Sequence, residues 1–505
     1  FTTISFCQRP NIIYIMTDDL AENAISAYSE KLIATPNIDR LAKEGLRFTN
    51  YFVGNSICGP VRATVLTGQH SHKNGVKDNS TRFDSSLITV PKLMQQENYT
   101  TAHIGKWHLH SYPTGFDYWK ILPGQGSYYQ PTFINMSGDT IKQPGYATDV
   151  VTDEAIRWMN QKRNDKKPFL LYLHHKAPHR NFFPPLKYIR QYSVKTFEEP
   201  ATLYLDTAGR GTAWHKQTMS ILPDMKLCSD LKVDPAYLMD NPLLKPDAGE
   251  IAQYNALMQR IPEEERKKIK EIYSLRGKIL EEQKPEGKKL LALKYQWYMQ
   301  DYLACVSSVD ENIGRLLLYL DSTGLAKNTV VMFTSDQGFY LGENGWFDKR
   351  FMYDVAMRTP LIIRWPQKIK PGAVANQLLQ NIDLAPTMLT IAGAKVPEWM
   401  QGKSFEPVLR NSKAKQLRSS LYYRYYEYGR DHTVLPHLGV RTNRYKLIYF
   451  NTVNEWEFYD LLNDAKEQHN LIGSKKHEAL FQNLKKQLIQ LRKDYDDTEA
   501  AGELN

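Results

Sequence analysis

The residues in this sequence with the most evident chemistry surround Cys58, in the run Ser-Ile-Cys-Gly-Pro-Val-Arg-Ala-Thr-Val-Leu-Thr-Gly over 56–68. Pro60 is typical of the first turn of a helix, so Cys58 should stand at or just before a helix N-terminus, where backbone N–H groups favour negative charge. Arg62 lies one helical turn further on, and its guanidinium can lie beside the cysteine. The segment predicts either an anion site with a reactive thiol or, more simply, a small buried cysteine.

Charged and polar residues also follow four apolar runs of strand length. Asp18 and Asp19 come directly after the run over 11–17, where two adjacent carboxylates favour a hard cation over a solvated turn. The other three runs are followed by Lys106 and His108 after 100–104, by His179 after 169–173, and by Asp336 and Gln337 after 329–334. Because strands of an α/β sheet present their carboxyl ends at one edge, we expect these side chains to form one cluster.

The elements that must position this cluster alternate between strands and helices. Helices are predicted over 35–45 and over 295–321, the second with apolar residues at helical spacing. We expect an α/β domain over residues 10–400 that carries the site. Beyond it, Tyr-rich alternating segments and a Lys-rich helix predict a smaller C-terminal domain over 401–505, an antiparallel sheet plus a helix. The long irregular segment over 197–247 is expected to cover a pocket.

Composition and charge limit the kinds of partner. The chain has 505 residues, 42% of them hydrophobic, and a net charge of +10, which favours an acidic partner. No zinc-finger spacing and no basic run with interleaved aromatics occurs, so nucleic acid is not expected. No apolar run is long enough for a transmembrane segment. Residues 1–7 are typical of the tail of a secretory signal peptide, which predicts export, and Cys7 leaves a lipid anchor open.

The segment Cys58-Gly-Pro-Val-Arg62, continued into Leu66-Thr67-Gly68, resembles the maturation motif of the type I, formylglycine-dependent sulfatases of the alkaline phosphatase-like superfamily. The segments over 35–42 and 105–108 resemble the same family. Val61 stands where serine is commoner, and Gln337 where asparagine or histidine is commoner. The resemblance implies a large mixed β-sheet sandwiched by helices, with a smaller C-terminal antiparallel sheet plus helix.

The resemblance also implies a set of roles at the site. Cys58 would be oxidised to formylglycine (3-oxoalanine) by a formylglycine-generating or anaerobic sulfatase-maturating enzyme, and its hydrated aldehyde would attack sulfur. Ca²⁺ would be bound by Asp18, Asp19, Asp336, Gln337 and modified Cys58, an oxygen-rich set that suits a hard cation. The remaining implied catalytic residues are Arg62, Lys106 and Lys349 against the sulfate charge, His179 as the acid for the leaving alcohol, and His108 in sulfate release.

The segments over 175–181 and 335–350 resemble bacterial N-acetylglucosamine-6-sulfatases that act on glycosaminoglycans such as heparan sulfate. The resemblance implies an exported enzyme, periplasmic or at the outer surface of a bacterium, that acts on a sulfated mono- or oligosaccharide. The long segment over 197–247 can enclose a pocket, so we expect action at chain ends. Asp348, Arg350 and His437 are candidates for sugar binding, with surface or packing roles as the alternative. Other sulfate positions (2-O, 3-O or 4-O), a phosphatase or phosphodiesterase of the same superfamily, and a glycan-binding relative with unmodified Cys58 stay open.

Overall fold

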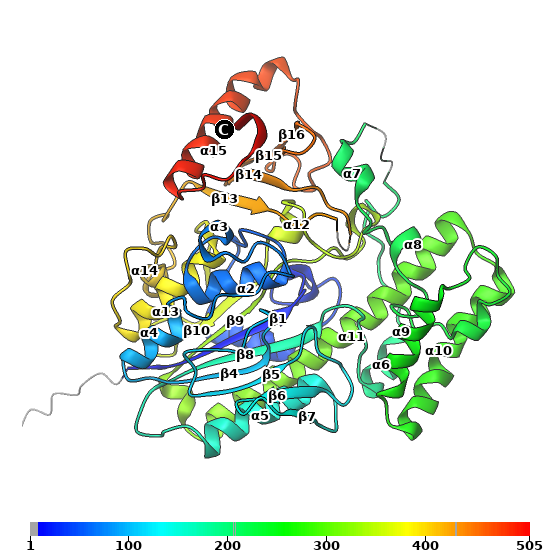
Figure 1. Ribbon diagram of the computed structural model, residues 1–505, viewed down its shortest axis with the longest axis horizontal. Helices are drawn as coiled ribbons and strands as arrows, with labels where there is room; N and C mark the ends of the chain where they lie inside the picture. The colour runs from blue at the N-terminus through cyan, green and yellow to red at the C-terminus, as the bar shows by residue number, and fades with distance from the viewer. Residues whose placement is uncertain (1–8, 206, 208, 430–431, 505) are drawn as a thin grey trace, which may run out of the picture.

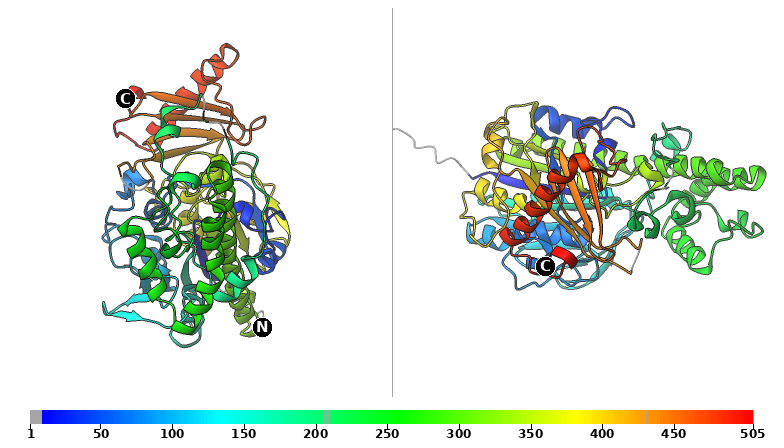
Figure 2. Two further views of the ribbon diagram at one scale, coloured as in Figure 1. Left: turned by 90° about the vertical axis from the view of Figure 1, so that its right-hand side faces the viewer. Right: turned by 90° about the horizontal axis from the view of Figure 1, so that it is seen from above.

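The computed structural model describes residues 9–205, 207, 209–429 and 432–504. A ten-stranded mixed sheet runs through the larger part of the molecule (Figures 1 and 2). Its strands, in spatial order, are β11 (Ala373–Ala375), β2 (Leu46–Phe48), β10 (Leu361–Arg364), β9 (Thr329–Ser335), β1 (Asn11–Asp18), β8 (Phe169–Pro178), β4 (Thr100–Lys106), β5 (Tyr118–Leu122), β6 (Thr132–Asn135) and β7 (Thr140–Lys142).

The five neighbouring strands β9, β1, β8, β4 and β5 are parallel. Met16 of β1 pairs with His174 of β8 on one side and Thr334 of β9 on the other, so the ends of these strands are level. The predicted α/β class with a mixed sheet is confirmed. Strand β8 continues to Pro178, beyond the predicted end at Leu173, and His174, His175 and Lys176 are therefore part of the sheet.

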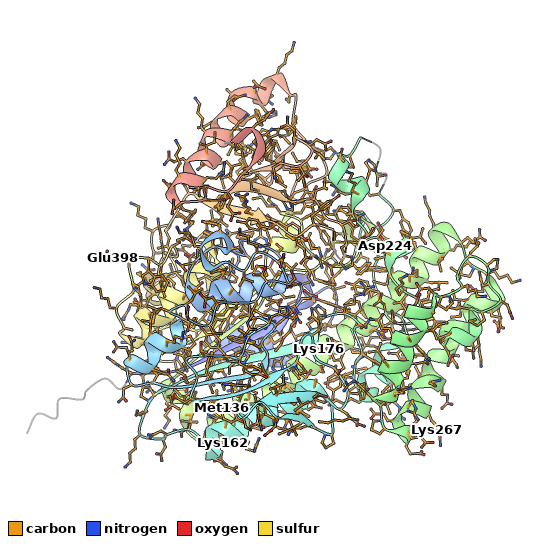
Figure 3. All side chains as sticks on the ribbon, viewed as in Figure 1. Met136, Lys162, Lys176, Asp224, Lys267 and Glu398 are labelled. Atoms are coloured by element: carbon orange, nitrogen blue, oxygen red, sulfur yellow. The ribbon has the colours of Figure 1, made fainter. Side chains whose placement is uncertain are left out.

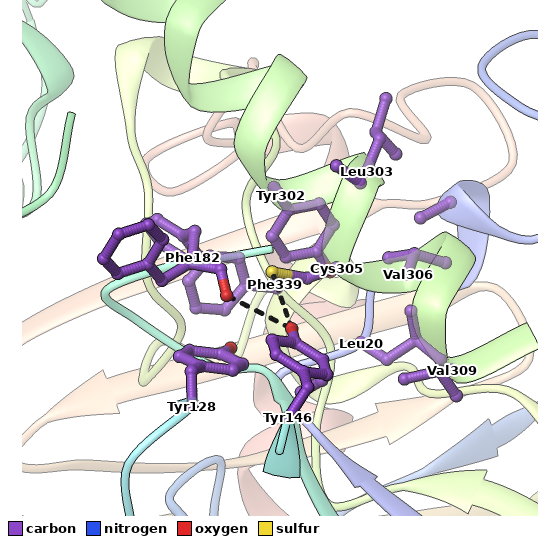
Figure 4. Packing of buried hydrophobic residues seen from close by; sticks show 14 of the residues in the cluster. Leu20, Tyr128, Tyr146, Phe182, Tyr302, Leu303, Cys305, Val306, Val309 and Phe339 are labelled. Carbon is purple, nitrogen blue, oxygen red and sulfur yellow. Dashed lines mark hydrogen bonds between the residues drawn. The ribbon is translucent and has the colours of Figure 1, made fainter. Parts of the chain in front are cut away.

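Strand β1 is apolar throughout because both faces of the sheet are covered. Ile13 and Ile15 belong to one core with α5 (Ala147–Gln161) and α11 (Gly287–Ser322), whereas Ile12 and Tyr14 belong to a second core with α2 (Cys58–Thr67) and α13 (Leu384–Ala392). Figure 4 shows part of the first core, where Cys305 and Val309 of α11 pack near Leu20 and Tyr146. The two cores hold the carboxyl edge of the sheet in a fixed position.

The predicted helices over 35–45 and 295–321 are present, but the second begins eight residues earlier, as α11. Asp310 of α11 accepts hydrogen bonds from the backbone N–H groups of Asn37 (3.0 Å) and Ile38 (2.8 Å), which ties the two helices together. The remaining helices of this part are α1 (Pro36–Glu44), α3 (Ser71–Asn74), α4 (Val90–Gln96), α12 (Asp354–Met357) and α14 (Glu406–Arg410).

Residues between β8 and α11 form a helical lobe at one side of the sheet (green, Figure 1). Its helices are α6 (Leu186–Tyr192), α8 (Ile221–Asp224), α9 (Ala248–Gln259) and α10 (Glu263–Gln283), whereas α7 (Thr212–Lys216) lies beside the C-terminal sheet, where the Thr212 N–H donates to Glu455 at 2.7 Å. The described residues of 197–247, the segment expected to be irregular, form only short helices and turns. Figure 3 shows Lys267 of α10 projecting outward from this lobe, as expected of a charged helical surface.

The C-terminal part is a four-stranded antiparallel sheet with one long helix, as predicted. It consists of β13 (Ser420–Tyr425), β14 (His437–Thr442), β15 (Tyr445–Phe450), β16 (Glu455–Asp460) and α15 (Glu478–Asp494). A short pair, β3 (Tyr51–Phe52) and β12 (Leu379–Gln380), lies apart from both sheets. Among the described residues, no helix is both long and apolar enough to cross a membrane.

Candidate active site

Cys58 is the first residue of α2 and is fully buried, in agreement with the predicted position at a helix N-terminus. Its thiol donates to Asp18 Oδ1 at 3.3 Å, and Gln337 Nε2 lies 3.6 Å from its sulfur. Helix α2 is buried along its whole length, so tertiary packing fixes the direction in which Cys58 points. The N-terminus of α2 thereby faces the ends of β1 and β9.

Three carboxylates meet beside Cys58. Asp18 ends β1, Asp19 follows in a left-handed conformation (φ 64°), and Asp336 follows β9; all three are fully buried. The backbone N–H of Asp19 donates to Asp336 Oδ1 at 3.0 Å. One ligand atom from each carboxylate and the Cys58 sulfur lie within 4.8 Å of one another. Since buried like charges repel, the three carboxylates need positive charge close to them.

The donor set fits a hard cation. Gln337 Oε1 is buried and has no hydrogen-bond partner among the described residues, although Gln337 Nε2 donates to Asp19. Three clustered carboxylates with a side-chain amide beside them are the kinds of ligand that Ca²⁺ takes in proteins. These residues can therefore hold calcium.

The pKa values of the carboxyl groups reflect this crowding. Burial and the neighbouring Asp18 raise the pKa of Asp336 to about 7, and burial, opposed by Lys349, raises that of Asp19 to about 6. Burial also favours neutral Asp18, but Lys106 and other cations outweigh it and hold the pKa of Asp18 well below its usual value. Burial and then Asp18 raise the pKa of the Cys58 thiol, so an unmodified Cys58 is a poor thiolate nucleophile.

Three cations surround the carboxylates, as the sequence predicts. Lys106 Nζ contacts Asp18, Lys349 Nζ lies 2.8 Å from Asp19 Oδ2, and Arg62 Nη2 lies 2.9 Å from Asp336 Oδ2. All three side chains are almost completely buried. An anion bound here would lie next to three positive charges in a buried environment, where electrostatic attraction is strong.

Two histidines complete the cluster. His179 Nε2 lies 3.5 Å from Asp19 Oδ2, and the Tyr128 hydroxyl donates to the His179 carbonyl at 2.5 Å. Burial holds the pKa values of His179 and His108 well below their usual value. His108 is nine-tenths buried, and its Nδ1 has no partner among the described residues. An anionic substrate beside either ring would raise its pKa.

Several residues of the site carry no sequence signal that singles them out. Gln125 accepts a hydrogen bond from Lys106 Nζ, and His174 Nδ1 lies 3.3 Å from Arg62 Nη1. His103 Nε2 in turn lies 3.1 Å from His174 Nδ1. Through these contacts Gln125 holds Lys106 in place and His174, itself in contact with His103, holds Arg62. Their places within β4 and β8 and after β5 become significant only once the fold brings these elements together.

Asp348 and Arg350 are buried beside Lys349. Arg350 Nε donates to Asp348 Oδ1 at 2.9 Å, and Arg350 also contacts Glu427, which follows β13. His432 Nε2 lies 3.3 Å from Asp348 Oδ2. The structure therefore brings these two candidates to the edge of the cluster, in a network that includes the C-terminal part.

The candidate role of His437 in sugar binding is wrong. Its ring is completely buried and stacks between Tyr423 and Tyr425, with ring centroids 5.5 and 5.3 Å away. Its Nε2 accepts from the Met352 N–H at 3.1 Å and its Nδ1 lies 2.8 Å from the Leu435 carbonyl. Because both nitrogens are engaged inside the protein, His437 is a packing residue.

The helical lobe reaches the cluster through Asp230. Arg180, just after His179, donates from Nε and Nη2 to the two oxygens of buried Asp230 at 2.7 and 2.6 Å. The same guanidinium lies 5.0 Å from the centre of the Phe347 ring. Lys176, near the centre of the molecule in Figure 3, lies 4.8 Å from the Tyr128 ring centre. The lobe therefore forms one wall of the site.

Comparison with known proteins identifies the family. Residues 10–394 match the sulfatase family model, and residues 342–494 match the model for the C-terminal region of N-sulphoglucosamine sulphohydrolase. The chain belongs to the sulfatase family, whose members hydrolyse sulfate esters.

Individual proteins give more specific comparisons than the family models do. The chain is 45% identical over 498 residues to an N-acetylglucosamine-6-O-sulfatase of Bacteroides thetaiotaomicron, covering 97% of this chain and 88% of the relative. A solved structure of a protein in complex with its substrate D-glucosamine-2-N,6-O-disulfate superposes with a TM-score of 0.93 at 44% identity, covering 98% of this chain and 100% of the other. A phosphonate monoester hydrolase of Agrobacterium radiobacter shares the fold (TM-score 0.68, 20% identity, 96% of each chain).

Proposed function

We propose that this sulfatase hydrolyses the 6-O-sulfate ester of N-acetylglucosamine at the end of a glycosaminoglycan-derived chain. The observation that carries the proposal is the 45% identity, along nearly the whole chain, to an N-acetylglucosamine-6-O-sulfatase. A structural relative bound to a 6-O-sulfated glucosamine supports the same sugar class. The buried cations around Cys58 suit a compact anion such as a sulfate group.

We further propose that Cys58 is matured to formylglycine and that Asp18, Asp19, Asp336 and Gln337 hold Ca²⁺. When present, the aldehyde hydrate supplies the oxygen nucleophile and the cation supplies positive charge next to it. The raised pKa of the unmodified thiol and the unpartnered Gln337 oxygen support this assignment. Maturation requires a formylglycine-generating or anaerobic sulfatase-maturating enzyme as a partner.

The residues around Cys58 then divide the work. Arg62, Lys106 and Lys349 neutralise the charge that spreads over the sulfate oxygens. His179 delivers a proton to the departing sugar alcohol, since an alkoxide is a poor leaving group, and His108 assists the release of sulfate. His179 starts with a depressed pKa, and the sulfate anion raises it on binding.

The sugar itself is proposed to contact Asp348 and Arg350. Their mutual hydrogen bond and the contact of Arg350 with Glu427 hold them in place beside Lys349. With the lobe wall at Arg180 and Asp230, these groups favour a closed pocket and hence action at chain ends. We retain the division into residues 10–400, which carry the site, and 401–505, which brace it through Glu427.

Export to the periplasm or the outer surface of a bacterium is proposed on the kind of substrate, since glycosaminoglycan fragments are large polyanions. Cys7, the candidate lipid attachment site, and the rest of the proposed signal tail lie outside the described residues.

The proposal is tested by two measurements on protein produced with a maturating enzyme. Peptide mass spectrometry across Cys58 should show the aldehyde, and sulfate should be released from 6-sulfated N-acetylglucosamine in preference to the 2-, 3- and 4-sulfated sugars. An aldehyde with turnover only at another position would contradict the 6-O assignment. An unmodified thiol and no turnover of any sulfate ester would favour a glycan-binding protein.

A further inference from the structure

A separate cavity of about 430 Å³ lies beside the candidate active site. Pro123 and Gly124, at the end of β5, line it, and β5 runs parallel to β4. The next residue, Gln125, contacts Lys106 Nζ, and His108 lines the cavity directly. The cavity is therefore at the same edge of the sheet as the carboxylate cluster, one strand further out, and its volume is in the range of small-ligand sites.

The cavity wall has a positive bias. None of its lining residues is acidic, and Arg82 among them carries a permanent positive charge. Arg82 is exposed and makes no hydrogen bond or ion pair within the described part of the chain. No ion pair joins it to its acidic neighbours in sequence: Asp84 accepts from Ser86, and Asp78 accepts from Ser80 and Thr81. An anionic ligand would give Arg82 a partner.

The wall also offers an aromatic surface. Tyr112 lines the cavity, is 55% exposed, and stacks on Trp119 with ring centroids 5.5 Å apart and planes at 28°. Stacking holds the Tyr112 ring in place, and its electron-rich face suits the C–H groups of a sugar ring.

We propose that this cavity is a second sugar subsite, which binds an anionic sugar joined to the 6-sulfated sugar in the active site. Tyr112 supports the face of the second ring, and Arg82 pairs with its carboxylate or sulfate. The inference rests on the proposed function and deepens it, since it makes the neighbouring sugar a part of substrate recognition.

The test compares kcat/KM for four substrates: 6-sulfated N-acetylglucosamine alone, and the same sugar joined to a uronate, to a sulfated hexose or to a neutral hexose. The unaltered enzyme should prefer the anionic disaccharides. R82Q should lower kcat/KM for them by about tenfold and change the monosaccharide and the neutral disaccharide by less than about twofold. Y112A should weaken all three disaccharides but not the monosaccharide. R190Q, an exposed arginine of α6 outside the cavity, is the matched control.

The two anionic disaccharides distinguish a carboxylate from a sulfate as the partner of Arg82. No preference of the unaltered enzyme for either, or an equal loss on the neutral disaccharide in R82Q, would overturn the subsite. Calorimetry with the C58A variant measures binding of the same four sugars without turnover. If matured enzyme releases no sulfate but C58A binds anionic disaccharides through Arg82, the proposed function fails and the subsite stands; turnover with no Arg82 dependence overturns the subsite alone.

Discussion

The cluster around Asp18 and the cluster around Asp301 are both buried groups of charged side chains, but they are neutralised differently. Asp301 of α11 accepts from Arg276 at 2.8 and 2.9 Å, from Lys232 at 3.0 Å and from the Tyr273 hydroxyl at 3.0 Å. Burial favours neutral Asp301, yet Arg276 and Lys232 outweigh it and lower its pKa. A single carboxylate thus has a complete set of donors.

At the other cluster, three carboxylates share three cations, two of the carboxyl groups have raised pKa values, and Gln337 Oε1 has no partner in the described chain. Charges at Asp301 are arranged for the stability of the lobe. The raised pKa values and the unpartnered amide oxygen around Asp18, Asp19 and Asp336 instead favour a bound cation. The comparison teaches that carboxyl groups with raised pKa values beside an unpartnered polar atom, rather than burial of charge as such, mark the reactive site.

The largest expected effect is on the rate of sulfate release, and it differs between the buried cysteines beside the two clusters, Cys58 and Cys305. C58A should lower sulfate release by about 10⁵-fold because it removes the proposed nucleophile. C305A, beside Asp301, should keep turnover within about threefold, since it removes only a packing group. Sulfate release by ion chromatography measures both variants. Turnover by C58A near the unaltered rate would contradict the assignment of Cys58.

Stability should show the opposite order. D301N leaves Arg276 and Lys232 buried without their counter-charge and should lower the free energy of unfolding by about 3–5 kcal/mol. D336N, measured in chelator, should cost less than about 1 kcal/mol, because the lost contact with Arg62 is offset by relief of repulsion with Asp18. Denaturant unfolding followed by fluorescence measures both. A larger loss in D336N than in D301N would contradict the comparison.

Ca²⁺ should stabilise the folded protein through the Asp18 cluster and not through the Asp301 cluster. At a concentration of 100 times its Kd, Ca²⁺ should raise the free energy of unfolding by about 2.7 kcal/mol. D336N should abolish this gain and D301N should retain it. Thermal unfolding with calcium or with chelator gives the result, with Mg²⁺ as the control ion. Equal gains in both variants would place the cation elsewhere.

A third kind of buried carboxyl sharpens the comparison. Glu457 accepts from the Tyr353 and Tyr459 hydroxyls at 2.6 and 3.1 Å, and burial raises its pKa from 4.5 to about 7. Because the folded protein binds this proton more tightly, its stabilising contribution is complete below pH 4.5 and is lost as the pH rises through 7.

As the pH rises from 5 to 7, the free energy of unfolding of the unaltered protein should therefore fall by about 2 kcal/mol more than that of the E457Q variant. Denaturant midpoints over that range, measured in both proteins, give the difference. Parallel pH dependences would show that Glu457 ionises without cost in the folded protein.

The sequence alone was sufficient for the residues whose neighbours along the chain reveal them. The apolar run of β1 that ends in Asp18 and Asp19, and Pro60 after Cys58, identify a buried strand edge and a helix N-terminus because these signals are local. The parallel α/β arrangement then follows, since strands that alternate with helices present their ends at one edge. All ten of the predicted metal and catalytic residues lie at that edge.

Tertiary structure decided what depends on distant pairing. His437 has the polarity of a ligand-binding residue, but β14 buries it between two tyrosines of β13. Gln125 reaches Lys106 only because β5 pairs with β4, and Asp230 reaches Arg180 only because the lobe folds back on β8. The type of a residue fixes the chemistry that it can do. Whether its polar atoms already have partners, and so whether it can bind a ligand, depends on which distant groups the fold brings within hydrogen-bond distance.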